Sequence, residues 1–213
     1  SNKLAMEKGA CPKTMETKYG HGITPNQTYK KDLDELVKHK ERQNWKELRK
    51  NLKEHGIRNS TLMALMPAET SAQISNSTNG IEPPRGYISI KQSKHGVLKQ
   101  VVPGFPYYKN KYDLLWEQKS PQGYLKIMAV LQKYIDQGIS VNTSYNPEHY
   151  EDEKVPMSVL IQDLLMFYKY GGKQLYYNNT YDGQGEIDIN KDDKLEDLPM
   201  GEIDDEDCES CKI

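Results

Sequence analysis

The stretches GYLKIMAVLQKYIDQGISVNTSY (residues 123–145) and PMSVLIQDLLMFYKYGGKQLYYNNT (residues 156–180) decide the fold class of this chain. Each begins with apolar residues at helical spacing, reaches a glycine, and then changes to a short run of strand-forming residues. Pro156 falls in the first turn of the second helix, where proline is tolerated. Because helices alternate with apolar strands, we predict an α/β fold, as a layer or a barrel, with buried strands.

The residues before position 123 extend this alternation. The expected helices are SNKLAMEK (1–8), KKDLDELVKHKE (30–41), NWKELRKNLKEHG (44–56) and TSAQISNST (70–78). The expected strands are a short buried one, STLMALM (60–66), and a hairpin pair, GYISIK (86–91) and GVLKQVVP (96–103). Since a helix begins at the first residue without a lead-in, we expect the chain to start inside a larger structure.

The charge of the chain is divided unevenly between a basic body and an acidic tail. The net charge is −2, but residues 182–213 hold 13 acidic residues against 3 lysines, which gives this segment −10 and leaves residues 1–181 with +8. Apolar residues become sparse after Asp182, so we predict a flexible tail. The body lacks the interleaved aromatic and basic motifs of nucleic-acid modules, so we expect a phosphate-bearing small molecule or a protein partner and no nucleic acid.

The composition suits a cytoplasmic protein. Hydrophobic residues make up 36% of the 213 residues, which is enough for a modest core. No apolar run is long enough to span a bilayer, and the N-terminus lacks the regions of a signal peptide. Three cysteines are too few for a disulfide framework. We therefore expect a cytoplasmic location and no membrane partner.

The segment MPAETSAQ (66–73) is the first candidate site. A strand, a proline turn and a helix that opens with Thr70 and Ser71 would expose backbone N–H groups and two hydroxyls, an arrangement that binds anions. The same residues fit a capping box between Thr70 and Gln73, an ordinary feature of helix starts. On local sequence alone the capping box is the stronger interpretation, because helix starts far outnumber phosphate sites.

Two further features have mainly structural interpretations. Adjacent residues of a strand point to opposite faces, so Tyr176 and Tyr177 are expected to place one ring in the core and one on the surface. The helix over 156–170 has an apolar stripe, which favours core packing but also fits a docking edge for a partner. The residues of this stripe are Val159, Leu160, Leu164 and Phe167.

The chain ends in DDEDCESCKI, where two residues separate Cys208 from Cys211. A zinc site would need a second cysteine or histidine pair, and a thioredoxin-like motif would need a strand before it and a helix after it. A mobile dithiol fits better, because a flexible chain of about 30 residues spans roughly 30 Å. Cys11, the third cysteine, is expected to be a structural thiol.

No metal site is expected in the chain. DINKDDKLEDLP (188–199) begins like a calcium loop, with acidic or amide side chains at alternate positions. Asp193 stands where such a loop needs glycine, and Pro199 stands where it needs glutamate. The segment is therefore rejected as a calcium site.

Three stretches together resemble one family. RNSTLMALMPAETSAQISNSTNGIEPPRGYISIK (58–91), KVPMSVLIQDLLMFYKYGGKQLYYNNT (154–180) and CESCKI (208–213) are similar, in this order, to the C-terminal part of the large (α) subunit of class Ia ribonucleoside-diphosphate reductase. The resemblance extends from the first residue to the last. It implies that residues 1–181 form the C-terminal portion of a ten-stranded α/β barrel and that residues 182–213 form a flexible acidic tail with redox cysteines.

The resemblance also implies roles for individual residues. Tyr176 and Tyr177 match a tyrosine pair that relays a radical by coupled electron and proton transfer. Cys208 and Cys211 match a tail dithiol that re-reduces the active-site disulfide and is itself reduced by thioredoxin or glutaredoxin. The family's loop for the substrate diphosphate matches residues 67–71, which favours the anion site over the capping box. The residues of this loop are Pro67, Ala68, Glu69, Thr70 and Ser71.

The implied activity is the reduction of ribonucleoside diphosphates to deoxyribonucleoside diphosphates for DNA synthesis by radical chemistry. The family's radical-bearing cysteine, its reducible cysteine pair and its N-terminal domain for the effectors ATP, dATP and dNTPs all belong to regions upstream of this chain. No cofactor is expected to bind the chain itself. The resemblance implies two protein partners, the N-terminal part of the large subunit and a small (β) subunit with a di-iron tyrosyl radical centre. The chain is therefore expected to be inactive alone.

A different class of function also fits the residues. A non-enzymatic interaction module would use the acidic tail to sense redox state or to bind metal through Cys208 and Cys211. Tight zinc binding without reduction by thioredoxin would favour this module over the reductase.

Overall fold

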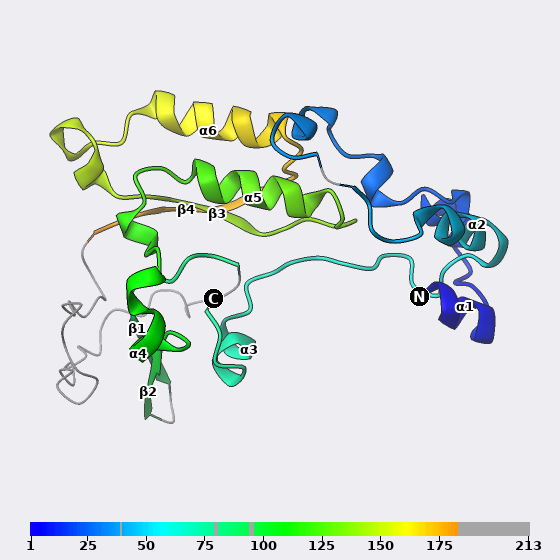
Figure 1. The fold of residues 1–213 in the computed structure, drawn as a ribbon, viewed down its shortest axis with the longest axis horizontal. Coiled ribbons are helices and arrows are strands. Elements are labelled where there is room, and N and C mark those ends of the chain that lie inside the picture. Colours follow the sequence, from blue (N-terminus) through cyan, green and yellow to red (C-terminus); the bar gives the residue numbers. More distant parts are fainter. Residues whose placement is uncertain (39, 79–80, 94–95, 183–213) are drawn as a thin grey trace. The chain divides into compact units, whose positions relative to one another are not determined.

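The structure of the chain is a computed structural model that describes residues 1–38, 40–78, 81–93 and 96–182 (Figure 1). The described chain forms two compact units. The first combines Ser1–Glu69 with Trp116–Asp182, and the second contains Thr70–Leu115. Helices and strands occur in both, which confirms the predicted α/β class. The predicted acidic tail lies outside the described residues from position 183 onward, so its flexibility stays a prediction.

Most helices of the first unit lie where the sequence predicts them, because caps and glycines fix their ends. Asn44 caps one helix by accepting a hydrogen bond from the N–H of Glu47 at 3.1 Å. Gly56, with φ of 68°, ends the same helix in a conformation that favours glycine. The helices are α1 (Asn2–Lys8), α2 (Trp45–His55), α5 (Gln122–Gln132) and α6 (Met157–Lys169).

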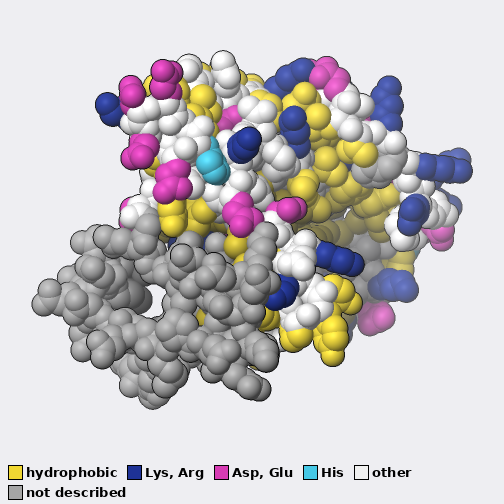
Figure 2. All heavy atoms as spheres, turned by 60° about the vertical axis from the view of Figure 1, so that its left-hand side comes forward, with side chains coloured by type: hydrophobic (Ala, Val, Ile, Leu, Met, Phe, Trp, Pro, Cys, Tyr) yellow, Lys and Arg dark blue, Asp and Glu magenta, His cyan; other side chains and the backbone are white. Residues whose placement is uncertain are grey.

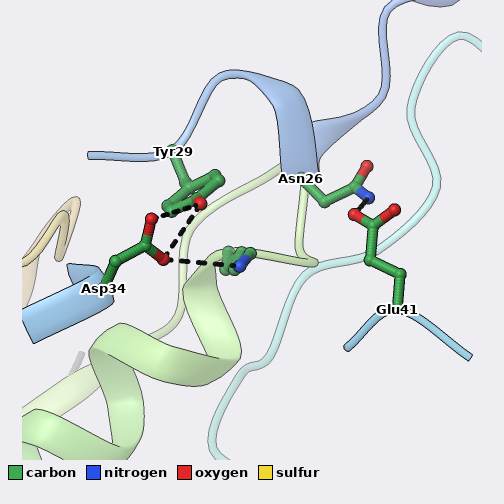
Figure 3. A network of polar contacts seen from close by, with 5 residues as sticks. Asn26, Tyr29, Asp34 and Glu41 are labelled. Carbon is green, nitrogen blue, oxygen red and sulfur yellow. Dashed lines mark hydrogen bonds and ion pairs between the residues drawn. The ribbon is translucent and has the colours of Figure 1, made fainter. Parts of the chain in front are cut away.

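The helix predicted over residues 30–41 is wrong in extent, because among the described residues of this range only Lys31–Glu35 is helical, and it forms a 3-10 turn. Side-chain contacts hold this turn. The Tyr29 hydroxyl donates to both carboxylate oxygens of Asp34, at 3.0 Å each (Figure 3). The Nζ of Lys133, at the end of α5, lies 3.9 Å from Oδ1 of Asp34 and 4.0 Å from the centroid of the Tyr29 ring. These tertiary contacts override a weak helical pattern.

The sheet of the first unit is parallel, as expected when helices connect its strands. β3 (Val141–Tyr145) pairs with β4 (Leu175–Thr180), and a parallel bridge joins Leu65 to Ile139. α5 contacts both α6 and β3 (Figure 1). The buried core residues of this unit form two clusters. The smaller cluster contains Tyr19, Leu52 and Ile57. The larger cluster contains Leu33, Tyr124, Leu125, Met128, Ala129, Ile135, Ile139, Val141 and Phe167.

The connection between α6 and β4 depends on two glycines. Gly171 has φ of 95°, a value that other residues rarely adopt. At Gly172, an added Cβ would lie 2.2 Å from the ring of Phe167. Only glycine therefore lets the chain turn closely past this buried ring, and the turn sets the start of β4.

The buried strand predicted over residues 60–66 is wrong. Leu65 alone makes a β-bridge, and the side chains of Leu62 and Met63 are exposed. The N–H groups of Leu62 and Met63 each donate to the carboxylate of Asp136 at 2.7 Å. This side chain takes the place of a neighbouring strand at Leu62 and Met63, and backbone hydrogen bonds between this described segment and residues 137–140 are made only by Met63 and Leu65, so a single bridge forms instead of a strand.

Hydrogen bonds to Asp136 also change its acidity. Burial alone would raise the pKa of Asp136, but the hydrogen bonds that its carboxylate accepts outweigh burial and lower the pKa. The donors are the N–H groups of Met63, Leu62 and Gln137 and the hydroxyl of Tyr19. A carboxylate with a lowered pKa stabilises the fold above the ordinary aspartate pKa of about 3.9, and this contribution is lost as the pH falls through the folded pKa.

Asp136→Asn is expected to lower the free energy of unfolding at neutral pH by about 1–2 kcal/mol, since an amide offers one acceptor oxygen to three N–H groups at a partly exposed site. In this variant the free energy of unfolding should fall less steeply as the pH drops below about 4. Urea unfolding over a series of pH values measures both effects. Asp113→Asn, at an exposed aspartate, is the control and should behave like the original chain. Identical acid branches for the original and Asp136→Asn chains would contradict this role.

The second unit is built on the predicted β-hairpin. β1 (Ile88–Ser93) and β2 (Gly96–Val101) pair antiparallel, with Ile88 opposite Val101. Tyr87, Val102 and Phe105 form its small core, in which the Tyr87 and Phe105 rings meet edge to face at 5.4 Å between centroids. Two α-helices accompany the hairpin: α3 (Glu69–Ile74), which is shorter than predicted, and α4 (Phe105–Tyr108).

Hydrophobic residues also lie at the surface, outside the buried clusters. Figure 2 shows hydrophobic side chains at the surface, among charged side chains of both signs. The exposed hydrophobic side chains of the described residues include Leu164, Leu165 and Tyr168 on α6 and Tyr107 and Tyr108 on α4. Exposed groups of this kind are typical of surfaces that contact another protein.

Candidate functional site

Tyr176 and Tyr177 lie side by side on β4 at the surface of the first unit. Their exposed fractions are 51% and 57%, so neither ring is in the core. The ring centroids are 4.2 Å apart with an interplanar angle of 55°. The Tyr177 hydroxyl donates a long hydrogen bond to the Tyr176 hydroxyl, with 3.4 Å between the oxygens. The expectation of one core ring and one surface ring is therefore wrong.

A β-bulge explains why the two rings meet. Val141 pairs with Leu175 and Thr143 pairs with Asn178, so Tyr176 and Tyr177 both stand opposite the single residue Asn142. An extra residue interrupts the alternation of side chains between the two faces. The Oδ1 of Asn142 accepts a hydrogen bond from the N–H of Tyr177 at 3.0 Å. A regular strand would place the two rings on opposite faces, and the bulge instead places them side by side.

The contact between the hydroxyls raises the pKa of Tyr177. The main cause is the hydrogen bond to Tyr176, which is followed by the charge of that neighbour and by burial. An already neutral phenol is held neutral at physiological pH, so its oxidation by one electron must also release its proton. Two neutral phenols with adjacent hydroxyls are suited to exchange a hydrogen atom, which moves an electron and a proton together.

Polar contacts on both sides hold β4 in place. At its start, the Nζ of Lys173 donates to the carbonyl oxygens of Ile135, Asp136 and Gln137 at distances of 2.6–3.2 Å. The side chain of Leu175 packs against the core of the first unit. Beyond the bulge, these contacts continue with Thr143 Oγ1, which donates to Asn178 Oδ1 at 2.9 Å. The tyrosine pair therefore stands on a strand that is fixed before and after it.

A buried carboxylate supports this sheet from α6. Asp163 is fully buried, and its oxygens accept hydrogen bonds from Gln122 Nε2 at 2.8 Å and from the Tyr145 hydroxyl at 3.0 Å. Burial and the nearby charge of Asp163 raise the pKa of Tyr145. Sequence reasoning missed this group. The available signal was an aspartate four residues after Val159 and four before Phe167, on the apolar stripe.

The predicted diphosphate segment forms a turn followed by a helix start. Pro67, Thr70 and Ser71 are exposed, and Ala68 is half-buried. α3 begins at Glu69, so the first backbone N–H groups of the helix follow the proline turn as the sequence indicates. The segment extends across the boundary between the two units.

Of the three cysteines, Cys11 lies within the described residues. Cys208 and Cys211 lie outside the described residues, as does the rejected calcium segment over 188–199. Cys11 is a half-buried free thiol whose sulfur accepts a hydrogen bond from Thr14 Oγ1 at 3.6 Å, and its N–H donates to Ile57. Within the described part of the chain, no three metal-ligating side chains gather into a group that could hold an ion.

The family is decided by comparison with known proteins. A model of the family described as "Ribonucleotide reductase, barrel domain" matches residues 1–108 and 105–178. The chain belongs to this family. The ribonucleotide reductase resemblance of the three sequence stretches is thereby confirmed. None of the helices in the residues that the structure describes has the length and apolar character needed to cross a bilayer.

Individual ribonucleotide reductase subunits match along the whole chain. The chain is 54% identical to the ribonucleoside-diphosphate reductase 1 subunit alpha of Salmonella typhimurium, over 100% of this chain and 27% of that protein. It is 55% identical to the subunit alpha of Haemophilus influenzae, over 91% of this chain and 26% of that protein. The subunit alpha of Enterobacteria phage T4 is 43% identical over 100% of the chain. The chain spans about a quarter of the length of the curated relatives that it matches.

Proposed function

We propose that the chain is the C-terminal part of a ribonucleoside-diphosphate reductase large subunit and serves the reduction of ribonucleoside diphosphates. The observation that carries this proposal is the contact between Tyr176 and Tyr177 in a chain of this family, because two adjacent neutral phenols can relay a radical. In this proposal the described strands belong to a ten-stranded α/β barrel, which the N-terminal part of the subunit completes. Residues 182–213 form its flexible acidic tail.

The proposed reaction is a two-electron reduction that balances with a dithiol. Hydrogen replaces the 2′-hydroxyl of the substrate ribose, the hydroxyl leaves as water, and two active-site thiols become a disulfide. The role of the tyrosine pair is to pass oxidising equivalents toward that site. An incoming radical takes a hydrogen atom from one phenol, and the resulting phenoxyl radical takes a hydrogen atom from its neighbour. Each exchange conserves charge, which suits a pair in which the hydrogen bond to Tyr176 raises the pKa of Tyr177.

Residues 67–71 are proposed to bind the substrate diphosphate. Backbone N–H groups at the start of α3 and the hydroxyls of Thr70 and Ser71 are suited to phosphate oxygens. The hydroxyls are exposed, and the net charge of +8 over residues 1–181 favours an anionic ligand. Pro67 and Ala68 form the turn before the helix, and Glu69 is its first residue.

Cys208 and Cys211 are proposed to regenerate the active-site dithiol. A tail thiolate attacks the active-site disulfide and forms a mixed disulfide. The second tail thiolate then attacks the mixed disulfide, which releases the active-site dithiol and leaves the tail as a disulfide. Thioredoxin or glutaredoxin then reduces the tail disulfide by the same exchange. A tether raises the local thiol concentration to about the millimolar range, which makes the first attack efficient.

Other components complete the proposed enzyme. The N-terminal part of the large subunit supplies the radical-bearing cysteine, the reducible cysteine pair and the sites for ATP, dATP and dNTP effectors. A small subunit with a di-iron tyrosyl radical centre supplies the oxidant to the tyrosine pair. The proposed location is the cytoplasm, where thioredoxin and glutaredoxin keep thiols reduced.

The exposed face of α6 is proposed to contact the small subunit. The predicted stripe divides here, because Phe167 is only 3% exposed and belongs to the core, whereas Leu164 is exposed. Substitution of Phe167 would therefore damage the fold rather than test docking. The exposed apolar residues of α6 are Met157, Ile161, Leu164, Leu165 and Tyr168.

Leu165→Glu is expected to weaken the affinity of the small subunit by about tenfold or more, since burying a leucine contributes roughly 1.5–3 kcal/mol. The affinity is measured by titration of the assembled large subunit with the small subunit. Ile127→Glu on α5 is a matched control, because Ile127 is 59% exposed and Leu165 is 60% exposed. Equal losses of affinity in both variants, or no loss in Leu165→Glu, would place the contact elsewhere.

The proposed function is tested by assembling the enzyme from its parts. The chain is mixed with an N-terminal part of the large subunit, the small subunit, thioredoxin and its reductant, and a ribonucleoside diphosphate. Formation of deoxyribonucleoside diphosphate is expected only in the complete mixture. Turnover by this chain with the small subunit and reductant alone would contradict the assignment of the radical-bearing cysteine to the N-terminal part.

A further inference from the structure

The bulge beneath the tyrosine pair has a side-chain partner on the opposite strand. An extra residue in a β-ladder leaves a backbone N–H without its regular acceptor. In β4 the N–H of Tyr177 instead donates to Oδ1 of Asn142 at 3.0 Å, and Asn142 is the residue of β3 opposite both tyrosines. The side chain thus replaces a ladder hydrogen bond at the point where the strand departs from regular geometry.

We infer that Asn142 is a positioning residue for the tyrosine pair, whose side-chain oxygen holds the peptide of Tyr177 in the bulged conformation that keeps the two phenols in contact. The geometric part of this inference stands on the observed contacts. Its consequence for turnover rests on the proposed relay function. Asn142 acts through the backbone of Tyr177, whose N–H donates to its side-chain oxygen.

The contacts on either side of the bulge show what Asn142 adds. The pairing of Val141 with Leu175 fixes one end, and the hydrogen bond between Thr143 and Asn178 fixes the other. These contacts hold the register on either side of the bulge. The hydrogen bond from the Tyr177 N–H to Asn142 adds a restraint within the bulge itself, on the peptide between Tyr176 and Tyr177. Loss of Asn142 should therefore loosen the ring pair without moving the rest of the strand.

A looser ring pair would slow the relay, because the rate of hydrogen-atom transfer between two phenols depends steeply on the distance between them. A displacement of about 1 Å can cost as much as a hundredfold in rate. The hydroxyl oxygens are already 3.4 Å apart, near the limit of a hydrogen bond. A small rotation of the Tyr177 peptide is enough to break this contact and to return the pKa of Tyr177 toward its ordinary value.

The test uses the full chain with a fluorinated tyrosine at position 177, assembled with the N-terminal part and the small subunit. Fluorine NMR at a series of pH values follows the pKa of this one ring among the 15 tyrosines. Asn142→Ala removes the acceptor, whereas Asn142→Asp keeps an oxygen at the same position. The side chain of Asn142→Ser is too short for its oxygen to reach the N–H of Tyr177, so this variant replaces Asn142→Ala if the alanine variant does not fold.

Two controls calibrate the measurement. Tyr176→Phe in the labelled chain gives the pKa of residue 177 when the hydroxyl contact is absent. Asn179→Ala removes another asparagine of β4, one that donates only a long bond of 3.5 Å to Ser144 Oγ. Asn179→Ala should leave the pKa of the label and the turnover unchanged.

We expect Asn142→Ala to lower the pKa of the label to the value found with Tyr176→Phe and to lower kcat by about tenfold to a hundredfold, with little change in KM. Asn142→Asp should restore both. A label pKa that stays unchanged in Asn142→Ala and Asn142→Ser would overturn the inference, whatever happens to turnover. A lowered pKa with unchanged kcat would support the placement by Asn142 and would contradict the relay role of the pair.

Discussion

The Tyr177→Phe variant is expected to lower the turnover of the assembled enzyme by at least about a thousandfold, and Tyr176→Phe should do the same. A phenylalanine ring has no hydroxyl hydrogen to exchange, so the relay stops at either substitution. Both rings are exposed and outside the core, and among the described residues their hydroxyls hydrogen-bond only to each other. Neither substitution should therefore change the stability of the fold by more than about 0.5 kcal/mol.

A second adjacent tyrosine pair provides the control. Tyr107 and Tyr108 on α4 are also exposed, and their ring centroids are 6.5 Å apart. Tyr107→Phe removes the same atom from a similar setting and should leave turnover unchanged. The assay measures deoxyribonucleoside diphosphate formed per small subunit. A Tyr177→Phe enzyme that retains a tenth or more of the original turnover would exclude position 177 from an obligatory relay.

Cys208→Ser and Cys211→Ser are each expected to reduce thioredoxin-driven turnover to about one product per chain, because the active-site disulfide formed in the first cycle is no longer reduced. A small dithiol added in excess should restore repeated turnover, since it can attack the active-site disulfide directly. The measurement compares product yield with thioredoxin and with the small dithiol. This difference between reductants separates a shuttle from a residue that the chemistry itself requires.

Cys11→Ser is the matched control for the tail cysteines. Cys11 is half-buried, and its sulfur accepts a hydrogen bond from Thr14. Since Cys11 has no proposed role in disulfide exchange, its replacement should leave the product yield with either reductant unchanged. Multiple turnovers by Cys208→Ser with thioredoxin as the sole reductant would rule out the tail as the obligatory carrier. Loss of activity with both reductants would instead indicate a structural or chemical role.

Elements with strong local signals were predictable from the sequence. α2 begins at an asparagine cap and ends at Gly56, and α6 begins after a proline and ends before two glycines, so local chemistry fixes their ends. The hairpin of β1 and β2 also follows from alternation around a turn. In each case the residues that decide the element lie within it or beside it.

Features that depend on distant residues were not predictable in this way. The alternation rule for Tyr176 and Tyr177 holds only in a regular ladder, and the bulge arises from pairing with Asn142, a residue 35 positions earlier for Tyr177. The segment over residues 60–66 has strand-forming composition, but Asp136 accepts from the N–H groups of Leu62 and Met63, and backbone pairing with residues 137–140 is limited to a single bridge. The role of the tyrosine pair came from the family resemblance, because no local pattern distinguishes it from the other tyrosines.

The most direct test of the relay is to look for the radical on the pair itself. Tyr177 is replaced by 3-aminotyrosine, whose ring is easier to oxidise, and the assembled enzyme is mixed with substrate and effector and followed by electron paramagnetic resonance. We predict an aminotyrosyl radical at position 177 that forms as the radical of the small subunit disappears. Complete incorporation of the analogue in an enzyme that binds the small subunit, with loss of the small-subunit radical but no signal at position 177, would contradict the account.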